Sequence, residues 1–251
     1  MVESRVLVDY LNQLLRLDEI SDASQNGLQV QCPERIEKIG FAVDAALETF
    51  EEASRQGMQL LIVHHGLYWK DVQLAVDAHY QRLKVLFDAG IGLYAAHLPL
   101  DSHELYGNNS QLAELLGLID VSPFGEYHGE IIGRLAHAAD KLTRDELRER
   151  IDSAIGTKCL FLPFGKDRVE KVAIVSGGGA DLLPQAIDER CDAFITGEHS
   201  HSAFHVAKEG GINLYFAGHY ATETLGVKAL QDLIANEFNV ETGFIDFPTG
   251  L

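Results

Sequence analysis

Two adjacent histidines at the end of an apolar run are the residues of this sequence best suited to chemistry. Residues 59–63 are predicted to form a short buried strand bounded by Gly57 and Gly66, and His64 and His65 follow it directly. Because neighbouring side chains on a strand point to opposite faces, both imidazoles serve one site only if the backbone turns here, which Gly66 permits. Ligands bind at the carboxyl ends of strands in open α/β sheets. For an isolated pair, the alternative is one core histidine with a neighbour in solvent.

Two further histidine–carboxylate pairs have a spacing of four residues. They are His97 with Asp101, and His219 with Glu223. If a helix begins near residue 220, His219 and Glu223 face the same side one turn apart. Pro99 instead predicts a loop between His97 and Asp101, because proline disfavours helical geometry in the residue before it.

These groups together indicate a metal site. Imidazole and carboxylate ligands without a thiolate suit Zn, Fe, Mn or a similar divalent ion. The set holds more ligands than one tetrahedral metal needs, and it fits two metals with a bridging carboxylate, which can hold a hydroxide nucleophile and stabilise developing negative charge. Each histidine alone could be a hydrogen-bonded core residue. Several such groups at the ends of predicted strands favour a metal or catalytic site.

An internal repeat supplies the elements that position these residues. The sequence over 35–43 recurs over 168–175 at an offset of 133, and the same offset aligns the run that ends in the histidine pair with residues 193–198. An offset of 122 then aligns His97 with His219 and Asp101 with Glu223. Matches in the same order along the chain indicate a duplicated α/β unit.

Each copy alternates strands with helices. The helices are predicted at 45–56, 79–89 and 107–116 in the first copy and at 180–189, 200–209 and 220–237 in the second. This alternation implies a mostly parallel sheet covered on both faces. We therefore predict an α/β fold of two similar three-layer α/β/α domains, residues 1–124 and 125–251, with the C-terminal part of the second packing on the first.

Segments outside the repeat add further expectations. Residues 2–17 have the apolar spacing of an amphipathic helix. Residues 129–162 are predicted to hold a strand, a helix that opens with a capping box at Thr143, and another strand.

Composition excludes several classes of function. The 46% hydrophobic content includes no apolar run near the ~20 residues of a membrane span. The net charge of −18 argues against a broad nucleic-acid-binding face. The first residues lack a secretory signal, and the three cysteines are too far apart for a thiolate zinc site, so we expect a cytoplasmic protein without disulfides.

Three other features have both a functional and an ordinary interpretation. Residues 176–179, Ser-Gly-Gly-Gly, could present backbone N–H groups to an anion, but most such runs are tight turns. Tyr68 and Trp69 could stack on a flat substrate ring, or serve in packing or subunit contact. Three histidines match no paired position and are interpreted as surface or helix residues: His103, His201 and His205.

The motifs resemble those of a known family. The blocks are residues 26–30, 64–69, 97–101, 107–109, 196–198 and 218–223, and together they are similar to the bacterial branch of the GTP cyclohydrolase I type 2 / Nif-three-like family. The resemblance spans most of the chain. It implies two intertwined α/β domains, a ring-shaped (toroid) homohexamer, and a dinuclear metal site facing the ring interior.

The resemblance also assigns roles to residues. The implied metal ligands are His64, His65, Asp101, His219 and Glu223, with Glu223 as the bridge. The resemblance implies that three further groups lie in the same pocket: His97, Glu198 and His199. There they would support the ligands or contact the substrate, and they could carry a proton during catalysis.

Two functions follow from these expectations. The first is a metal-dependent hydrolase with two divalent ions per subunit (Zn, Fe, Mn or Mg) that acts on a small molecule resembling a nucleotide or pterin. The alternative is a non-catalytic, metal-loaded ring that serves as a metal chaperone, a sensor or an interaction scaffold, because ligands alone establish binding and not turnover.

Overall fold

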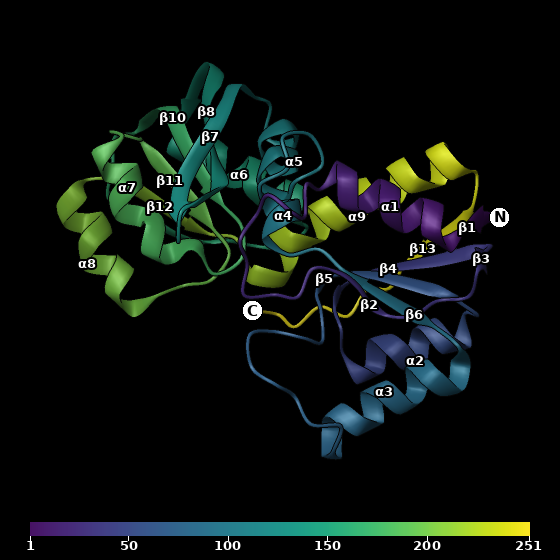
Figure 1. Ribbon diagram of the computed structural model, residues 1–251. Helices are drawn as coiled ribbons and strands as arrows, with labels where there is room; N and C mark the ends of the chain where they lie inside the picture. Colours follow the sequence, from purple (N-terminus) through teal and green to yellow (C-terminus); the bar gives the residue numbers. More distant parts are fainter. The chain divides into compact units, whose positions relative to one another are not determined.

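The chain forms two compact units. The computed structural model describes residues 1–140 and 142–251 in full and residue 141 by its backbone alone. Unit 1 comprises Met1–Leu100 and Val227–Phe247, and unit 2 comprises Asp101–Gly226 and Pro248–Leu251 (Figure 1). The chain passes between the units within helix α4 (Leu98–Asp101), within helix α9 (His219–Phe238) and again after Phe247.

Unit 1 is built on a five-stranded sheet in the order β13-β4-β5-β6-β2. The strands β13, β4, β5 and β6 are parallel, and β2 is antiparallel to β6. Its strands are β2 (Gly27–Val30), β4 (Lys38–Asp44), β5 (Leu60–His65), β6 (Gly92–Ala95) and β13 (Glu241–Phe244), and a separate small ladder joins β1 (Val2–Glu3) to β3 (Arg35–Ile36). Parallel pairing places the carboxyl ends of β4, β5 and β6 at one edge.

Helices cover both faces of this sheet (Figure 1). One face carries α2 (Leu47–Arg55) and α3 (Asp77–Ala89), and the other carries α1 (Ser4–Leu14) and the later part of α9. Alternate residues of β5 explain the packing, because Leu61 and Val63 share a buried cluster with Phe50 of α2 and Leu86 of α3.

Unit 2 is built on a six-stranded mixed sheet in the order β7-β8-β10-β11-β12-β9. Only β10, β11 and β12 are parallel to one another. The strands are β7 (Leu118–Tyr127), β8 (Glu130–Thr143), β9 (Leu160–Pro163), β10 (Arg168–Val175), β11 (Ala193–Thr196) and β12 (Asn213–Phe216). The antiparallel β7–β8 hairpin extends the sheet on one side, and antiparallel β9 closes the other.

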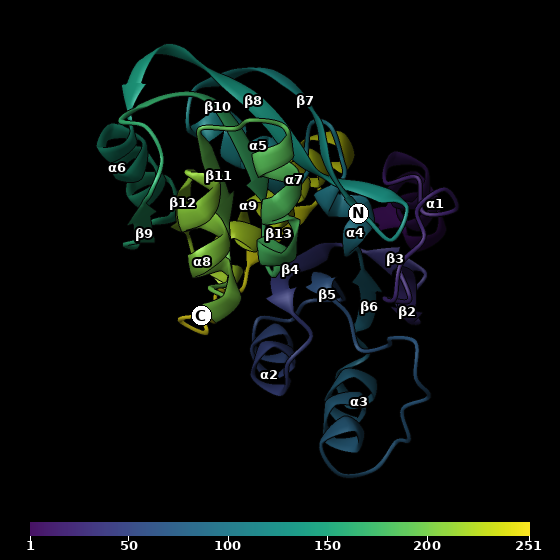
Figure 2. The same ribbon diagram turned by 90° about the vertical axis from the view of Figure 1, so that its left-hand side faces the viewer.

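Helices also lie on both faces of the second sheet. In Figure 2, α7 (Leu183–Asp188) and α8 (His201–Gly210) lie in front of the strands, and the 3-10 helix η1 (Gly179–Leu182) leads into α7. Helices α5 (Asn108–Leu115) and α6 (Arg144–Ile155) cover the other face, where Leu112, Ile151 and Ile195 share one buried cluster. Helix α6 begins with the predicted capping box, in which Thr143 and Glu146 each accept a hydrogen bond from the other's backbone N–H.

The α/β fold is confirmed, and one local prediction is wrong. Residues Leu98–Asp101 form a single helical turn, α4, where we expected a loop. Proline is tolerated in the first turn of a helix because the N–H that it lacks has no helical partner there.

The internal duplication stays a prediction, although two strand registers agree with it. Ile39 pairs with Leu60 in unit 1, and Val172 pairs with Ala193 in unit 2, which reproduces the sequence offset of 133. The predicted division at residue 124 follows this repeat. The compact units change after residues 100, 226 and 247, and β13 completes the sheet of unit 1.

Among the described residues, no helix combines the length and the apolar character needed to cross a bilayer.

Candidate metal-binding site

Three histidines gather at the carboxyl edge of the sheet in unit 1. His64 and His65 end β5, and His97 follows β6. Their ring centroids lie 4.7 Å (His64–His65), 5.1 Å (His64–His97) and 5.6 Å (His65–His97) apart. Each ring offers a nitrogen atom within 4.8 Å of those of the other two, so the three histidines form a group that could hold a metal ion.

Each of these rings is oriented through its Nδ1 atom. Nδ1 of fully buried His64 lies 2.8 Å from the carbonyl oxygen of Ala96, and Nδ1 of His65 lies 2.8 Å from Oδ1 of Asp44. Nδ1 of His97 lies 3.0 Å from Oδ2 of Asp22. An oxygen acceptor at Nδ1 requires the N–H there, which makes Nε2 the atom through which each ring would bind a metal.

Asp22 is an ionised acceptor. Burial raises the pKa of this carboxyl, but hydrogen bonds from His97, Asn26 and the Ser24 backbone and the charge of His97 outweigh it, and the pKa falls to about 2. Asp22 also accepts the backbone N–H of Leu98 at 3.0 Å. It therefore holds both the ring of His97 and the start of the segment that follows.

Two amide side chains, one just before β2 and one within it, fix both histidine-bearing turns. Asn26 accepts the backbone N–H of His97 at 2.8 Å, and Gln29 accepts that of Leu67 at 2.7 Å. A Cβ atom on Gly66 would lie 2.4 Å from the Gln29 amide and 2.6 Å from the Ala95 side chain, so only glycine allows this approach.

Trp69 borders the histidine group. Its Nε1–H donates to the carbonyl oxygen of Gly66 at 3.2 Å, and its ring lies edge-on to His97 at 5.0 Å. Tyr68 is half-buried against the core and lies edge-on to His79 at 5.5 Å. Of the two predicted substrate contacts, Trp69 is thus beside the histidines and Tyr68 serves in packing.

In unit 2, α9 brings His219 and Glu223 together. The helix begins at His219, and the spacing of four places Nε2 of His219 3.0 Å from Oε2 of Glu223. Glu198, after β11, lies 2.7 Å from Nδ1 of His219. Burial lowers the pKa of His219, but the hydrogen bonds and charges of Glu223 and Glu198 outweigh it and raise the pKa to about 9.

Asp101 is held inside unit 2 by side-chain donors. Its Oδ1 accepts from Nδ2 of Asn108 at 2.8 Å and from the hydroxyl of Ser176 at 3.1 Å, and the carboxyl is buried. The neighbour of Ser176, Gly177, lies against the carboxylate of Glu223. A Cβ atom on Gly177 would lie 2.1 Å from Oε1 of Glu223 and 3.2 Å from Nε2 of His219.

The Ser-Gly-Gly-Gly segment thus contacts two predicted ligands. Gly177 has φ = +59° and accepts the backbone N–H groups of Gly197 and Glu198. The segment therefore forms a tight turn beside carboxylates.

The cysteines do not contribute thiolates to either cluster. All three are free, and burial raises the pKa of Cys159 and of Cys191 to about 12. The donors near the histidines are nitrogen and oxygen atoms, which suit zinc, iron or manganese.

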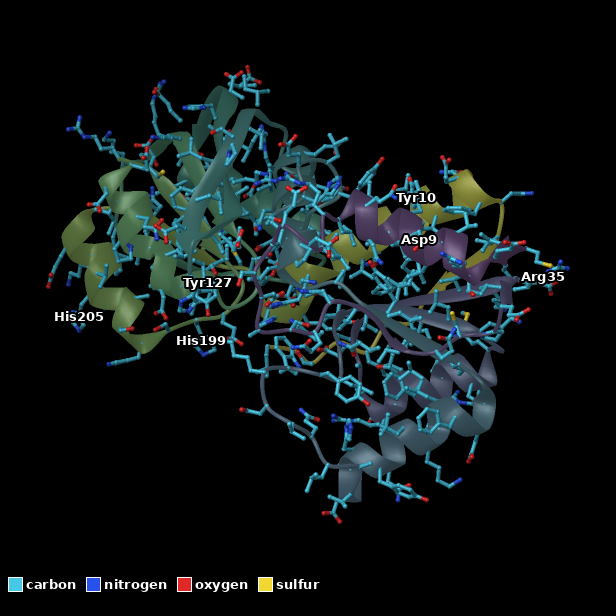
Figure 3. All side chains as sticks on the ribbon, in the orientation of Figure 1. Asp9, Tyr10, Arg35, Tyr127, His199 and His205 are labelled. Carbon is cyan, nitrogen blue, oxygen red and sulfur yellow. The ribbon has the colours of Figure 1, made fainter. Side chains whose placement is uncertain are left out.

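The other residues predicted to lie in the pocket differ in their surroundings. Glu198 orients His219, whereas the exposed His199 has its ring edge-on to Phe216 at 6.3 Å. Figure 3 labels His199 before α8 and His205 on that helix. Among the described side chains, none of His103, His201 and His205 belongs to a group that could hold a metal ion.

Sequence reasoning missed Asp22 and Asp44, the acceptors of His97 and His65. Asp44 carried a signal, because it is a carboxylate at the carboxyl end of a strand. Asp22 lies in the irregular segment before β2, 75 residues before its partner, and nothing in the local pattern predicts that contact.

The fold and the site together place this molecule among α/β proteins that carry histidine and carboxylate groups able to hold a metal ion. The chain is a member of the DUF34/NIF3 family, whose model, described as Duf34/NIF3 (NGG1p interacting factor 3), matches residues 2–249. A GTP cyclohydrolase 1 type 2 homolog from Archaeoglobus fulgidus is 41% identical over 245 residues, which cover 98% of both chains. A protein of the same name from Deinococcus radiodurans is 40% identical over 98% of this chain and 93% of its own.

A solved structure has the same fold. The crystal structure of TTHA1606 from Thermus thermophilus is 42% identical, covers all of both chains and superposes with a TM-score of 0.92. The family resemblance expected from the sequence is therefore confirmed.

Proposed function

We propose that this protein binds two divalent metal ions per chain through His64, His65, Asp101, His219 and Glu223. The observation that carries the proposal is the shared use of Nδ1. In all four histidines of the two clusters this atom faces an oxygen acceptor, which directs Nε2 to a metal. The close approach of the Glu223 carboxylate to Gly177, which a residue with a Cβ atom would block, supports the same conclusion. These nitrogen and oxygen donors suit Zn, Fe or Mn best. The alternative is Mg, a chemically harder ion that prefers oxygen ligands.

We propose further that the protein is a metal-dependent hydrolase. Bound divalent ions lower the pKa of water and stabilise negative charge that develops on a substrate. The name of the curated relatives, GTP cyclohydrolase 1 type 2 homolog, favours a nucleotide-like or pterin-like substrate. Trp69, beside His97, offers an aromatic surface on which a flat ring can stack.

The chain's own residues supply proton transfer and orientation in this proposal. The candidates to carry a proton are His97, Glu198 and His199, since imidazole suits proton transfer near neutral pH. Asp22 and Asp44 keep their histidine partners oriented. A cytoplasmic homohexamer, implied by the family resemblance, completes the proposal.

A substrate screen tests the enzymatic part. Protein reconstituted with Zn²⁺, Mn²⁺ or Fe²⁺ is incubated with nucleotides, cyclic pterins and phosphodiesters, alongside an Asp101→Ala variant. We expect metal-dependent hydrolysis that the variant loses. A fully metallated protein inert across the panel would favour the metal chaperone, sensor or scaffold.

A further inference from the structure

We propose that residues 70–76, the lid segment, close over the histidine group of unit 1 when substrate binds. The inference rests on the proposed function, because it needs a substrate at that group. It adds an apolar wall to the site, and it assigns the substrate a flat ring that Trp69 and the lid segment cover together.

The connection that contains the lid segment is longer than its position requires. Strand β5 ends at His65 and helix α3 begins at Asp77, so the eleven residues 66–76 join them. In unit 2, the connection from β11 to α8 takes only the four residues 197–200. A strand is commonly joined to the following helix by ~2–6 residues. Unit 1 exceeds unit 2 by eleven minus four, or seven, residues, which is the length of the lid segment.

Few bonds hold the lid segment to the rest of unit 1. In Figure 2 the chain between β5 and α3 forms a wide loop that stands away from the strands. All residues of the lid segment are exposed. Within the described chain, residues 70–75 take part in one backbone hydrogen bond, from the N–H of Val76 to the carbonyl oxygen of Leu74. A segment with few buried contacts and an exposed backbone changes conformation at a low cost in free energy, as a lid must.

The lid segment exposes apolar side chains to water. Val72, Leu74 and Val76 have exposed fractions of 89%, 71% and 57%. They belong to an uncharged run, residues 72–76, in a chain whose net charge is −18. Exposed apolar groups that lie together mark a binding surface, because covering them removes apolar area from water.

The two ends of the lid segment place it beside the histidine group. Trp69, directly before it, has its ring 5.0 Å from that of His97 and 6.2 Å from that of His65. At the other end, Asp77 has φ = +49°, and residues at the ends of elements absorb the backbone changes of hinged segments. A segment of this length, held at both ends, can reach about 11 Å, half of its extended length. The histidine group therefore lies within its reach.

Hydrogen exchange measures the closure directly. The full chain reconstituted with Zn²⁺ is compared without and with saturating GMP or neopterin, two probes that contain a flat ring. We expect the amides of residues 71–75 to exchange at the rate of an unstructured chain without a probe, and about 10-fold or more slowly with one. The connection between α6 and β9, residues 156–159, is the internal control and should not change.

A double variant tests the apolar wall. Val72→Ser/Leu74→Ser alters only exposed positions, so the fold should be unaffected. We expect its affinity for the probes, measured by isothermal titration, to fall about 10-fold or more, with Zn²⁺ affinity unchanged. Leu160→Ser, at an exposed position of β9, is the matched control and should bind the probes as the wild type does.

A deletion tests the length of the connection. Removing residues 70–76 leaves a connection of four residues between β5 and α3, as many as in unit 2. We expect the deletion variant to keep its circular dichroism spectrum and its Zn²⁺ binding, and to lose affinity for the probes at least as far as the double variant does.

The outcomes separate the lid from the proposed function. A probe that binds without protecting residues 71–75, or that binds both variants as tightly as the wild type, would overturn the lid alone. A double variant with an altered oligomeric state but unchanged probe affinity would assign the apolar residues to a contact between copies, which also overturns it. A Zn²⁺-loaded wild type that binds neither probe would overturn the lid together with the proposed substrate class.

Discussion

The Nδ1 atoms of four histidines carry most of the chemical argument. In His64, His65, His97 and His219 this atom faces a carbonyl or carboxylate oxygen at 2.7–3.0 Å. A ring held in this way presents one defined nitrogen, Nε2, and one defined direction. Such partners are typical of metal-binding histidines.

Gly177 is predicted to be essential for the position of Glu223. In Gly177→Ala, the new methyl group would meet Oε1 of Glu223 at 2.1 Å, so the carboxylate must move and metal affinity should fall by roughly 10- to 100-fold. The matched control is Gly211→Ala. Gly211 has a similar φ of +65° but no atom within 4 Å of the added Cβ, so it bears only the backbone cost of about 1–2 kcal/mol.

Isothermal titration with Zn²⁺ and thermal unfolding of both variants check this prediction. Equal metal affinity in the two alanine variants would show that the close approach of Gly177 to Glu223 has no role in binding.

The pKa of His219 provides a prediction about pH. In protein kept free of metal, the pKa is raised from 6.5 to about 9, so the folded state holds this proton more tightly than the unfolded state. The resulting stabilisation is fully present below pH 6.5 and is lost as the pH rises through about 9. Glu198→Gln should lower the pKa of His219, and Glu223→Gln should lower it more, because Glu223 makes the largest favourable contribution.

An NMR titration of the His219 ring protons measures these values directly. A pKa that stays near 9 in both glutamine variants would contradict the assigned partners.

Residue types and spacing predicted which of these side chains lie together better than they predicted the groups that orient them. The spacing of four found His219 and Glu223, because a helix places such residues on one face. The acceptors Asp22 and Asp44 depend on contacts between segments that are distant in sequence, so no local pattern reveals the first of them.

At the scale of elements, the ends of parallel strands position the histidine group of unit 1. Apolar runs predicted β4, β5 and β6 because both faces of this sheet are buried. The helical turn α4 was not predicted because proline inside a helix usually breaks it. Pro99 is nevertheless compatible with the first turn of a helix. The hairpin of β7 and β8 was predicted only in part, since its exposed outer positions mix polar and apolar residues.

Arg134 on β8 is predicted to stabilise the segment that carries Asp101. Its buried guanidinium donates to the carbonyl oxygens of Ser102 and Gly133 and to the hydroxyl of Ser110, the last at 2.9 Å. Arg134→Met leaves these acceptors without their donor and should destabilise the protein by about 2–3 kcal/mol. Urea unfolding measures the effect, and Arg168→Met, at an exposed position of β10, should change stability by less than about 0.5 kcal/mol.

The same variant separates stability from ligand placement. Since Ser102 follows Asp101 directly, Arg134→Met should also lower Zn²⁺ affinity at temperatures where the protein stays folded. Unchanged unfolding and unchanged Zn²⁺ binding would contradict a supporting role for Arg134.

At the scale of the whole molecule, the sequence predicted an α/β chain with a repeated arrangement of strands. The boundaries of the compact units were harder to predict, because β13 from the C-terminal part pairs with β4 from the N-terminal part of the chain. A repeat marks similar sequence, whereas a compact unit is defined by contacts, and the two criteria divide this chain differently.

The assembly implied by the family resemblance is testable in solution. Sedimentation equilibrium should give six times the chain mass of 27.7 kDa. A mass equal to one chain at micromolar concentration would contradict the predicted homohexamer.

The most direct test of the central claim is a crystal structure of the protein reconstituted with Zn²⁺, with anomalous data collected on both sides of the zinc absorption edge. The account predicts two zinc peaks per chain within bonding distance of His64, His65, Asp101, His219 and Glu223. Zinc peaks located only at other surface residues, with these five side chains unliganded, would contradict it.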